Sequence, residues 1–235
     1  MKTILTTCEH GGNIVPNSYK NLFKDSKSLL NSHRGYDIGA IDLYESMVNE
    51  ISDIHICYGI TRLLIDPNRS LHNKSLFSEI TGSLDKNNKQ YITDTFYNTY
   101  RDGVQALIEM SNKNGKHVIH IAVHTFTPVL NDKERTADVG LLYDPARNAE
   151  KNLCKLIKHH ITHNDPSLRV RFNYPYLGTS DGFVPYLRKQ FSQSDYTGVE
   201  LEVNQVFALK DKSRWEEVQE IVVGAFRSAI LDSNV

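Results

Sequence analysis

Hydrophobic and polar positions alternate along this chain in two rhythms, one typical of strands and the other of helices. The longest apolar run covers residues 118–123, reaches His124, and is closed by Pro128. A near-continuous apolar run of this length is typical of a strand buried in a parallel sheet, and proline cannot donate to a strand ladder. We therefore expect a central strand that ends close to His124.

The same criteria predict strands and helices in alternation along the rest of the chain. Strands are expected at residues 3–8, 54–60, 139–143, 168–172 and 197–204, with a further candidate at 61–69. Helices are expected at residues 38–51, 93–110, 148–163 and 215–230, with a short one within 17–32. Residues 70–93 and 173–182 are rich in polar and turn-forming residues and are expected to be loops. This order predicts an α/β fold with a mainly parallel sheet.

Length and composition restrict the class of protein. A chain of 235 residues without a repeat or a clear linker is expected to form a single domain over residues 1–235. Its net charge of −1 gives no electrostatic basis for binding nucleic acid or an anionic membrane. The three scattered cysteines, Cys8, Cys57 and Cys154, favour a reducing compartment over a disulfide framework. We expect a soluble, cytoplasmic protein, with no membrane segment and an oligomeric state left open.

Candidate metal ligands lie where expected strands end. Glu9 and His10 directly follow the first strand, and His124 ends the central one. Open α/β sheets bind ligands at the carboxyl ends of their strands, and histidine and acidic side chains are common metal ligands. Three acidic or histidine residues in and near these segments also have a structural explanation. His124 would be a hydrogen-bonded core histidine, Glu9 a polar loop residue, and Asp37 the N-cap of the helix that follows it.

Two further features have chemical potential. Arg69, which follows Asn68 at the end of an expected strand, carries a planar fork suited to a carboxylate, although a surface turn is the common explanation. The strand at 197–204 places Glu200 and Glu202 on one face, and in a central strand such acids need a metal, an arginine or a proton. The histidines at 159, 160 and 163 lie on a polar helix end, where solvation and the helix dipole explain them.

Seven motifs, taken together and in order, resemble the N-formylglutamate amidohydrolase family. They are CEHGGNIVP at 8–16, DIGA at 37–40, IDPNR at 65–69, HTFTP at 124–128, RTADVGLL at 135–142, NYPY at 173–176 and LEVN at 201–204. This family is similar in fold to zinc carboxypeptidases and aspartoacylase. The resemblance implies a phosphorylase/hydrolase-like (zinc-carboxypeptidase-like) α/β fold: one domain with a mainly parallel or mixed central sheet flanked by helices.

The resemblance also implies a zinc site. His124 matches the strand-end histidine ligand of these enzymes, and His10 matches the histidine of their first metal loop. Carboxypeptidases place a glutamate three residues after that histidine, whereas this chain has Asn13. The missing carboxylate must come from elsewhere, with Asp37 as the first candidate and Glu9 as the second. Zn²⁺ is the implied ion, and another divalent metal is an alternative.

The implied reaction is hydrolysis of N-formyl-L-glutamate to glutamate and formate, a reaction that the family name connects with histidine degradation. Glu202 matches the general base. Asn68 and Arg69 match the pair that holds a substrate carboxylate, and Arg135 is the candidate for a second carboxylate. Arg62 is a candidate for steadying the oxyanion. The motif at 173–176 adds two substrate-binding candidates, Asn173 and Tyr176.

Two alternatives stay open at the level of sequence. One is a metal-dependent amidohydrolase or carboxypeptidase-like enzyme that acts on another N-acyl amino acid or on a peptide. The other is a non-catalytic relative that binds a carboxylate ligand, and its main support is the asparagine at position 13.

Overall fold

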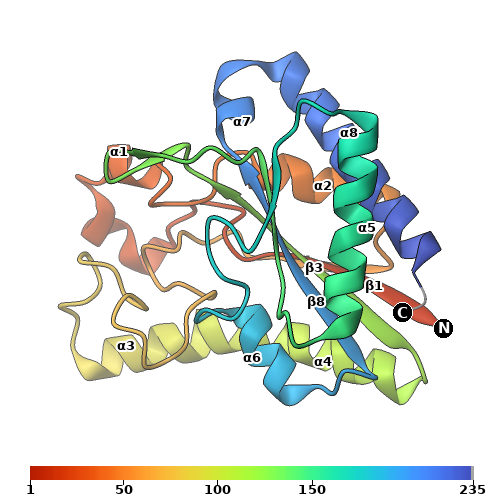
Figure 1. The fold of residues 1–235 in the computed structure, drawn as a ribbon. Coiled ribbons are helices and arrows are strands. Elements are labelled where there is room, and N and C mark those ends of the chain that lie inside the picture. Colours follow the sequence, from red (N-terminus) through yellow and green to blue (C-terminus); the bar gives the residue numbers. More distant parts are fainter. Residues whose placement is uncertain (234–235) are drawn as a thin grey trace.

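A six-stranded sheet runs through the middle of the molecule in the order β2-β1-β3-β8-β6-β7 (Figure 1). The computed structural model describes residues 1–233. The strands are β1 (Lys2–Cys8), β2 (Ile54–Cys57), β3 (His117–Phe126), β6 (Val139–Leu142), β7 (Val170–Phe172) and β8 (Tyr196–Asn204). All neighbouring strands are parallel except β6 and β8, which are antiparallel. The sheet is therefore mixed, and the predicted α/β class is confirmed.

Helices cover both faces of this sheet. The helices α2 (Ala40–Glu50), α5 (Asn148–Asn164) and α8 (Lys212–Asp232) lie on one face and share its largest apolar core (Figure 1). The helices α4 (Thr99–Lys113) and α6 (Phe183–Gln190) lie on the other. Every residue of β8 and nearly every residue of β3 is buried, because each strand has strand neighbours on both sides and helices above and below.

The remaining elements are short. They are η1 (Asn17–Phe23), α1 (Lys27–Leu30), α3 (Lys86–Ile92), η2 (Thr93–Asn98), the strands β4 (Val129–Leu130) and β5 (Lys133–Glu134), and α7 (Val206–Lys210). A small second core joins several of them to the loop that follows β2. It contains Tyr19, Phe23, Leu63, Leu64, Ile65, Leu76, Ile92 and Tyr97. This core fixes the backbone on either side of Asp66, which lies beside the candidate metal ligands.

η2 is a π-helical stretch within one continuous run of helix. It joins α3 to α4, so that all three elements cover residues 86–113 without a break. Ile92 and Tyr97, in the first half of this run, belong to the small core, whereas Tyr100 and Val104 belong to the core under the sheet. One helix therefore serves two separate apolar clusters.

Three sequence-based expectations were wrong. The segment at 61–69 contains turns and no strand, because Leu63, Leu64 and Ile65 are buried in the small core without a neighbouring strand. The expected loop at 70–93 contains α3, whose first turn is capped by the Asp85 carboxylate accepting from Asn88 N. The expected strand at 54–60 stops at Cys57. The helices α6 and α7 were not anticipated.

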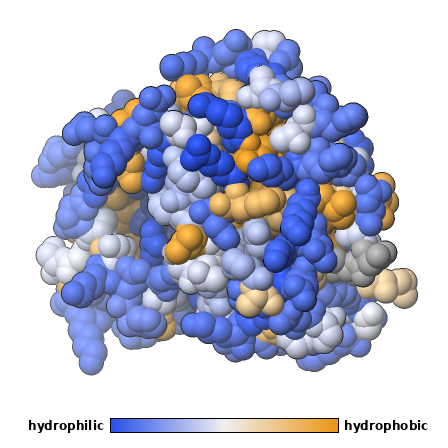
Figure 2. All heavy atoms as spheres, in the orientation of Figure 1, coloured by the Kyte–Doolittle hydropathy of each residue, from blue (hydrophilic) through white to orange (hydrophobic). Residues whose placement is uncertain are grey.

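The face in Figure 2 is mostly hydrophilic, with apolar residues in small separate groups. Within residues 1–233, no helix is both long and apolar enough to cross a membrane. On α5, His159 and His163 are exposed and His160 pairs with Asp232, in agreement with their interpretation as surface residues.

Candidate metal centre

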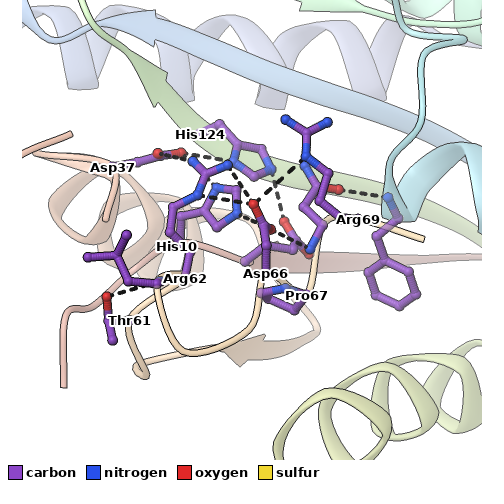
Figure 3. Close-up of polar contacts among 12 residues, drawn as sticks. His10, Asp37, Thr61, Arg62, Asp66, Pro67, Arg69 and His124 are labelled. Carbon is purple, nitrogen blue, oxygen red and sulfur yellow. Dashed lines mark hydrogen bonds and ion pairs between the residues drawn. The ribbon is translucent and has the colours of Figure 1, made fainter. Parts of the chain in front are cut away.

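Three potential metal ligands converge at the carboxyl ends of β1 and β3. His10 follows β1, His124 lies near the end of the adjacent strand β3, and Asp37 comes from the loop before α2. One ligand atom from each residue lies within 4.8 Å of the other two, and all three side chains are buried. Figure 3 shows these side chains pointing toward one another. The first-choice ligand set of the sequence is thus brought together.

The Asp37 carboxylate lies between the two histidines. Its Oδ2 is 3.2 Å from His10 Nδ1 and 3.0 Å from His124 Nδ1. Asp37 is not an N-cap, because α2 begins after Gly39, which occupies the cap position with φ 83°. His124 is buried, as its structural explanation required, yet its ring nitrogens face carboxylates.

The second nitrogen of each imidazole faces another buried carboxylate. His10 Nε2 lies 2.8 Å from Asp66 Oδ1. His124 Nε2 lies 3.0 Å from Glu9 Oε2, although the approach is too bent for a regular hydrogen bond. A carboxylate behind a histidine ligand is the usual arrangement in metal sites, because it fixes the tautomer and the orientation of the ring. Here it leaves both Nδ1 atoms directed at Asp37.

The acidic side chains of this cluster favour their charged form. Burial alone would raise the pKa of Glu9, but contacts with His124 outweigh it and lower the pKa to about 2. Against the same burial effect, His10 and Arg62 hold the pKa values of Asp37 and Asp66 well below their usual range.

These groups amount to three buried carboxylates beside one guanidinium. The Arg62 guanidinium contacts Asp37 Oδ1 at 3.3 Å and Asp66 Oδ2 at 2.7 Å. A neutral imidazole has one N–H and cannot satisfy a carboxylate at each nitrogen. Burial lowers the pKa of His124, but Asp37 and Glu9 more than reverse this and raise it well above its ordinary value. A second proton on His124, or a metal ion between its Nδ1 and Asp37, would give both carboxylates a positively charged partner. The residues present therefore fit a divalent cation.

Glu202 lies next to this cluster on β8. It pairs in register with His124 on β3, and it is buried. Its Oε2 has no hydrogen-bond partner within the described part of the chain. Burial, with help from Asp37 and Glu200, raises the pKa of Glu202 to about 8. Such a group can exchange a proton near neutral pH, as general acid–base catalysis requires.

A cavity of about 850 Å³ opens over these residues. It is lined by the three candidate ligands and by Glu202, and also by the predicted substrate-binding residues Asn68, Arg69, Arg135 and Tyr176. Glu200, two residues before Glu202 on the same face of β8, lines it as well. A volume of this size lies in the range of small-molecule sites, roughly 300–1,000 Å³.

The arginines of the cavity differ in how far they are already paired. Arg62 is held by Asp37 and Asp66, so its expected oxyanion role competes with two ion pairs. Arg69 Nη1 donates to the Asp181 carbonyl at 3.2 Å, and its side chain is 36% exposed. Arg135 Nη2 donates to the Tyr176 hydroxyl at 2.9 Å, while its buried Nη1 has no partner among residues 1–233.

Two of the predicted substrate-binding amides hold backbone instead. Asn173 does not line the cavity, because its Oδ1 accepts from Tyr143 N and Gly178 N, each at 3.0 Å, and so ties the loop to the end of β6. Asn68 does line the cavity, but its Oδ1 accepts from Phe183 N at 2.7 Å at the start of α6.

Asp66 and Glu200 were not among the site residues expected from the sequence. For Glu200, the sequence indicated only that an acid in a central strand needs a metal, an arginine or a proton. Asp66 stands inside the IDPNR motif directly before the proline, and this position was its only sequence signal.

A family model and several solved structures match this chain. A family model described as N-formylglutamate amidohydrolase matches residues 2–208. A structure of a gene product from Agrobacterium tumefaciens is similar with a TM-score of 0.83 and 22% identity, covering 98% of this chain and 91% of that one. A structure of N-formylglutamate amidohydrolase from Ralstonia eutropha is similar with a TM-score of 0.70 and 14% identity, covering 98% and 94%.

At these identities the two structures support the fold alone. No curated protein matched the sequence. The family model covers most of the chain, including all the candidate ligands and Glu202. The chain therefore belongs to the N-formylglutamate amidohydrolase family.

Proposed function

We propose that this protein is a zinc-dependent amidohydrolase that cleaves N-formyl-L-glutamate into glutamate and formate. One observation carries the proposal: His10, Asp37 and His124 converge in a cavity that is also lined by the buried Glu202, whose Oε2 has no hydrogen-bond partner among residues 1–233. Three protein ligands with an open position are the pattern of catalytic zinc sites. The products are also those that a role in histidine degradation would need.

The residues that would hold the ion are His10 and His124 through their Nδ1 atoms and Asp37 through Oδ2. When bound there, zinc would supply Lewis acidity and lower the pKa of a water at the site. Asp66 and Glu9 would keep the two imidazoles in place from behind. Asn13 donates to the Leu30 carbonyl and to Asn31 and makes no contact with the ligands. Asp37 is therefore proposed to supply the carboxylate ligand.

Glu202 is the proposed general base. Its carboxyl faces the cavity, stands opposite His124 in the sheet register, and has a pKa raised to about 8 by burial. It would take a proton from the attacking water and return it to the nitrogen of the leaving amino acid. Proton transfer by a positioned group of this kind contributes roughly 10²–10⁴-fold to a rate.

Two arginines would bind the carboxylates of the substrate. Arg69, about one third exposed at the cavity wall, is proposed to hold one carboxylate, with Asn68 beside it. Arg135, whose Nη1 is buried and unpaired within residues 1–233, is proposed to hold the other, with Tyr176 fixing its guanidinium. Arginine suits this task because its fork matches a carboxylate bidentately. Two such sites would favour an acidic amino acid.

The second candidate is an amidohydrolase for a larger N-acyl amino acid or a short peptide. The observation that favours it is the cavity volume of about 850 Å³, which exceeds what a formyl group and one glutamate need. The non-catalytic binding alternative loses its main support, because Asp37 stands where a ligand is needed despite Asn13.

One experiment tests the function. Purified protein is loaded with zinc, and release of free amine is measured for N-formyl and N-acetyl derivatives of glutamate, aspartate, glutamine and alanine, and for a formylated dipeptide. The highest kcat/KM is expected with N-formylglutamate, and it should vanish on chelation and return with zinc. A preference for the dipeptide or for an acetyl derivative would favour the second candidate. No turnover of any compound, with zinc bound, would reject the hydrolase.

A further inference from the structure

The side chain of Glu9 connects the candidate metal centre to a helix on the far side of β1. Glu9 follows β1 and is 1% exposed. Its Oε2 lies 3.0 Å from His124 Nε2, and its Oε1 accepts from the Tyr100 hydroxyl at 2.8 Å. Tyr100 belongs to α4, which packs under the sheet. Three buried side chains from three elements thus form one polar chain, Tyr100–Glu9–His124.

Each oxygen of the Glu9 carboxylate lies against a group with little room to move: Oε1 is hydrogen-bonded to Tyr100, and Oε2 is at ion-pair distance from His124 Nε2 without regular hydrogen-bond geometry. Tyr100 is held by its neighbours, since its ring lies 5.3 Å from that of Tyr58 and 6.0 Å from that of Phe183. His124 lies in the middle of the sheet and is 3% exposed. A carboxylate locked in this way restricts the ring rotation of the imidazole that it contacts.

The geometry also rules Glu9 out of the ligand set that the structure brings together. It faces Nε2 of His124, whereas Asp37 faces Nδ1 of both histidines. The three atoms that converge within 4.8 Å belong to His10, Asp37 and His124. Glu9, the second-choice ligand of the sequence, is not among them.

We propose that Glu9 is a positioning residue: it holds the His124 imidazole through Nε2 so that Nδ1 points at the metal position, and Tyr100 fixes Glu9. This inference rests on the proposed function, because it assumes that His124 binds the ion. It adds a residue on α4, outside the cavity, to the groups that set metal affinity.

The test is a zinc-binding titration of the full-length protein against a chromophoric chelator. Glu9→Gln keeps the size of the side chain but removes the carboxylate, and it should raise the zinc Kd roughly 10- to 100-fold, as for other partners of metal-bound histidines. Tyr100→Phe should raise the Kd by a smaller, few-fold factor. The double variant should bind no more weakly than Glu9→Gln alone, because Tyr100 acts through Glu9.

Tyr58→Phe is the matched control. The Tyr58 hydroxyl is buried in the same aromatic cluster but has no partner among the described residues, so its loss should leave the zinc Kd unchanged. A purely structural role for Glu9 would change thermal stability in chelator without moving the Kd. With Co²⁺ as the probe, Glu9→Gln should also shift the visible absorption bands, because these report ligand orientation.

Each outcome decides the inference. A zinc Kd for Glu9→Gln equal to that of the unmodified protein would overturn it. If Glu9→Gln does not fold, an unchanged Kd in Tyr100→Phe overturns it instead. An unmodified protein that binds no zinc would reject the proposed function itself, whereas normal binding with insensitive variants would reject only the role of Glu9.

Discussion

At the scale of single residues, the centre depends on which atom of each side chain faces which neighbour. The two histidines direct Nδ1 at Asp37 and Nε2 at Asp66 or Glu9. Glu202 is in none of these pairs, and its Oε2 lacks a hydrogen-bond partner in the described chain. A buried carboxyl without a partner is costly, so the position is expected to serve the reaction and not the fold.

Replacing Glu202 by glutamine should separate chemistry from metal binding. Glu202→Gln keeps the shape of the side chain but cannot take a proton, so zinc content should be normal and kcat should fall roughly 10²–10⁴-fold. Zinc is measured by elemental analysis and kcat with N-formylglutamate. Glu200→Gln is the matched control on the same face of β8. If the Glu200 variant loses turnover and the Glu202 variant keeps it, the base is Glu200.

The role of His124 can be compared with that of a second buried histidine on β3. His120 contacts Thr7 Oγ1 and the Tyr196 hydroxyl, each at 2.7 Å, and faces no carboxylate in those contacts. His124→Gln should abolish tight zinc binding, whereas His120→Gln should retain it. Elemental analysis after gel filtration measures both. Full zinc occupancy in the His124 variant would remove this residue from the ligand set.

At the scale of elements, two loops that follow β5 and β7 each contribute a side chain to the cavity. Arg135 follows the short β4–β5 hairpin, and Tyr176 comes from the loop after β7. Their contact of 2.9 Å links the two segments over the cavity, with the Arg135 guanidinium 5.0 Å from the centre of the Tyr176 ring. This part of the cavity wall therefore consists of two loops joined by the Arg135–Tyr176 pair and by the hydrogen bond from Thr136 N to the Tyr174 hydroxyl at 3.2 Å.

Substituting this arginine should affect substrate binding more than turnover. Arg135→Lys keeps a positive charge but loses the planar fork, so KM for N-formylglutamate should rise by about tenfold or more while kcat changes little, given about 1.5–3 kcal/mol for a charged hydrogen bond. Steady-state kinetics measure both constants. For N-formylalanine, which has one carboxylate, the same substitution should change KM less. An equal change for both substrates would place the second carboxylate elsewhere.

Some of these elements were predictable from the sequence alone, and others were not. The strands β1, β3 and β8 were predictable because each is marked by a local run or alternation of apolar residues. His10, His124 and Glu202 lie at or near the ends of these expected strands. The strand expected at 61–69 was wrong because Leu63, Leu64 and Ile65 are buried by segments distant in the sequence. The contacts of Asp66 and Tyr100 were unpredictable for a related reason: each depends on a partner from another element.

At the scale of the whole molecule, the candidate centre joins parts of the chain that are far apart. Its side chains come from β3, from the residues directly after β1, from the loop before α2 and from the segment after β2. A cation bound there would stabilise the folded state only, because the unfolded chain does not bring these groups together. Its removal should therefore be visible in the stability of the entire domain.

Chelation should lower the melting temperature by roughly 10 °C. Ligand in thousandfold excess over Kd contributes about 4 kcal/mol. Each kcal/mol shifts the melting temperature of a protein of this size by about 2–4 °C. Differential scanning calorimetry with zinc and with chelator measures the shift. In His124→Gln the two scans should coincide, and a zinc effect that persists there would indicate another binding site.

Acid should destabilise the fold partly through His120. Burial lowers the pKa of His120 to about 4, whereas an unfolded histidine titrates near pH 6.5. The unfolded chain therefore binds a proton first, and stability falls as the pH drops from about 6.5 to 4. Urea unfolding of chelated protein at several pH values measures this. His120→Gln should show a shallower fall over that interval, and equal slopes would contradict the assignment.

The π-helical stretch η2 has a consequence for how the chain tolerates insertion and deletion. Successive residues of an α-helix are rotated by about 100° around its axis, and a π turn holds one residue more. The extra residue lets Ile92 and Tyr97 face the small core while Tyr100 and Val104 face the sheet. Deleting one residue between positions 93 and 98 would restore a regular helix but change its phase, so that one of the two halves would turn its apolar stripe toward solvent.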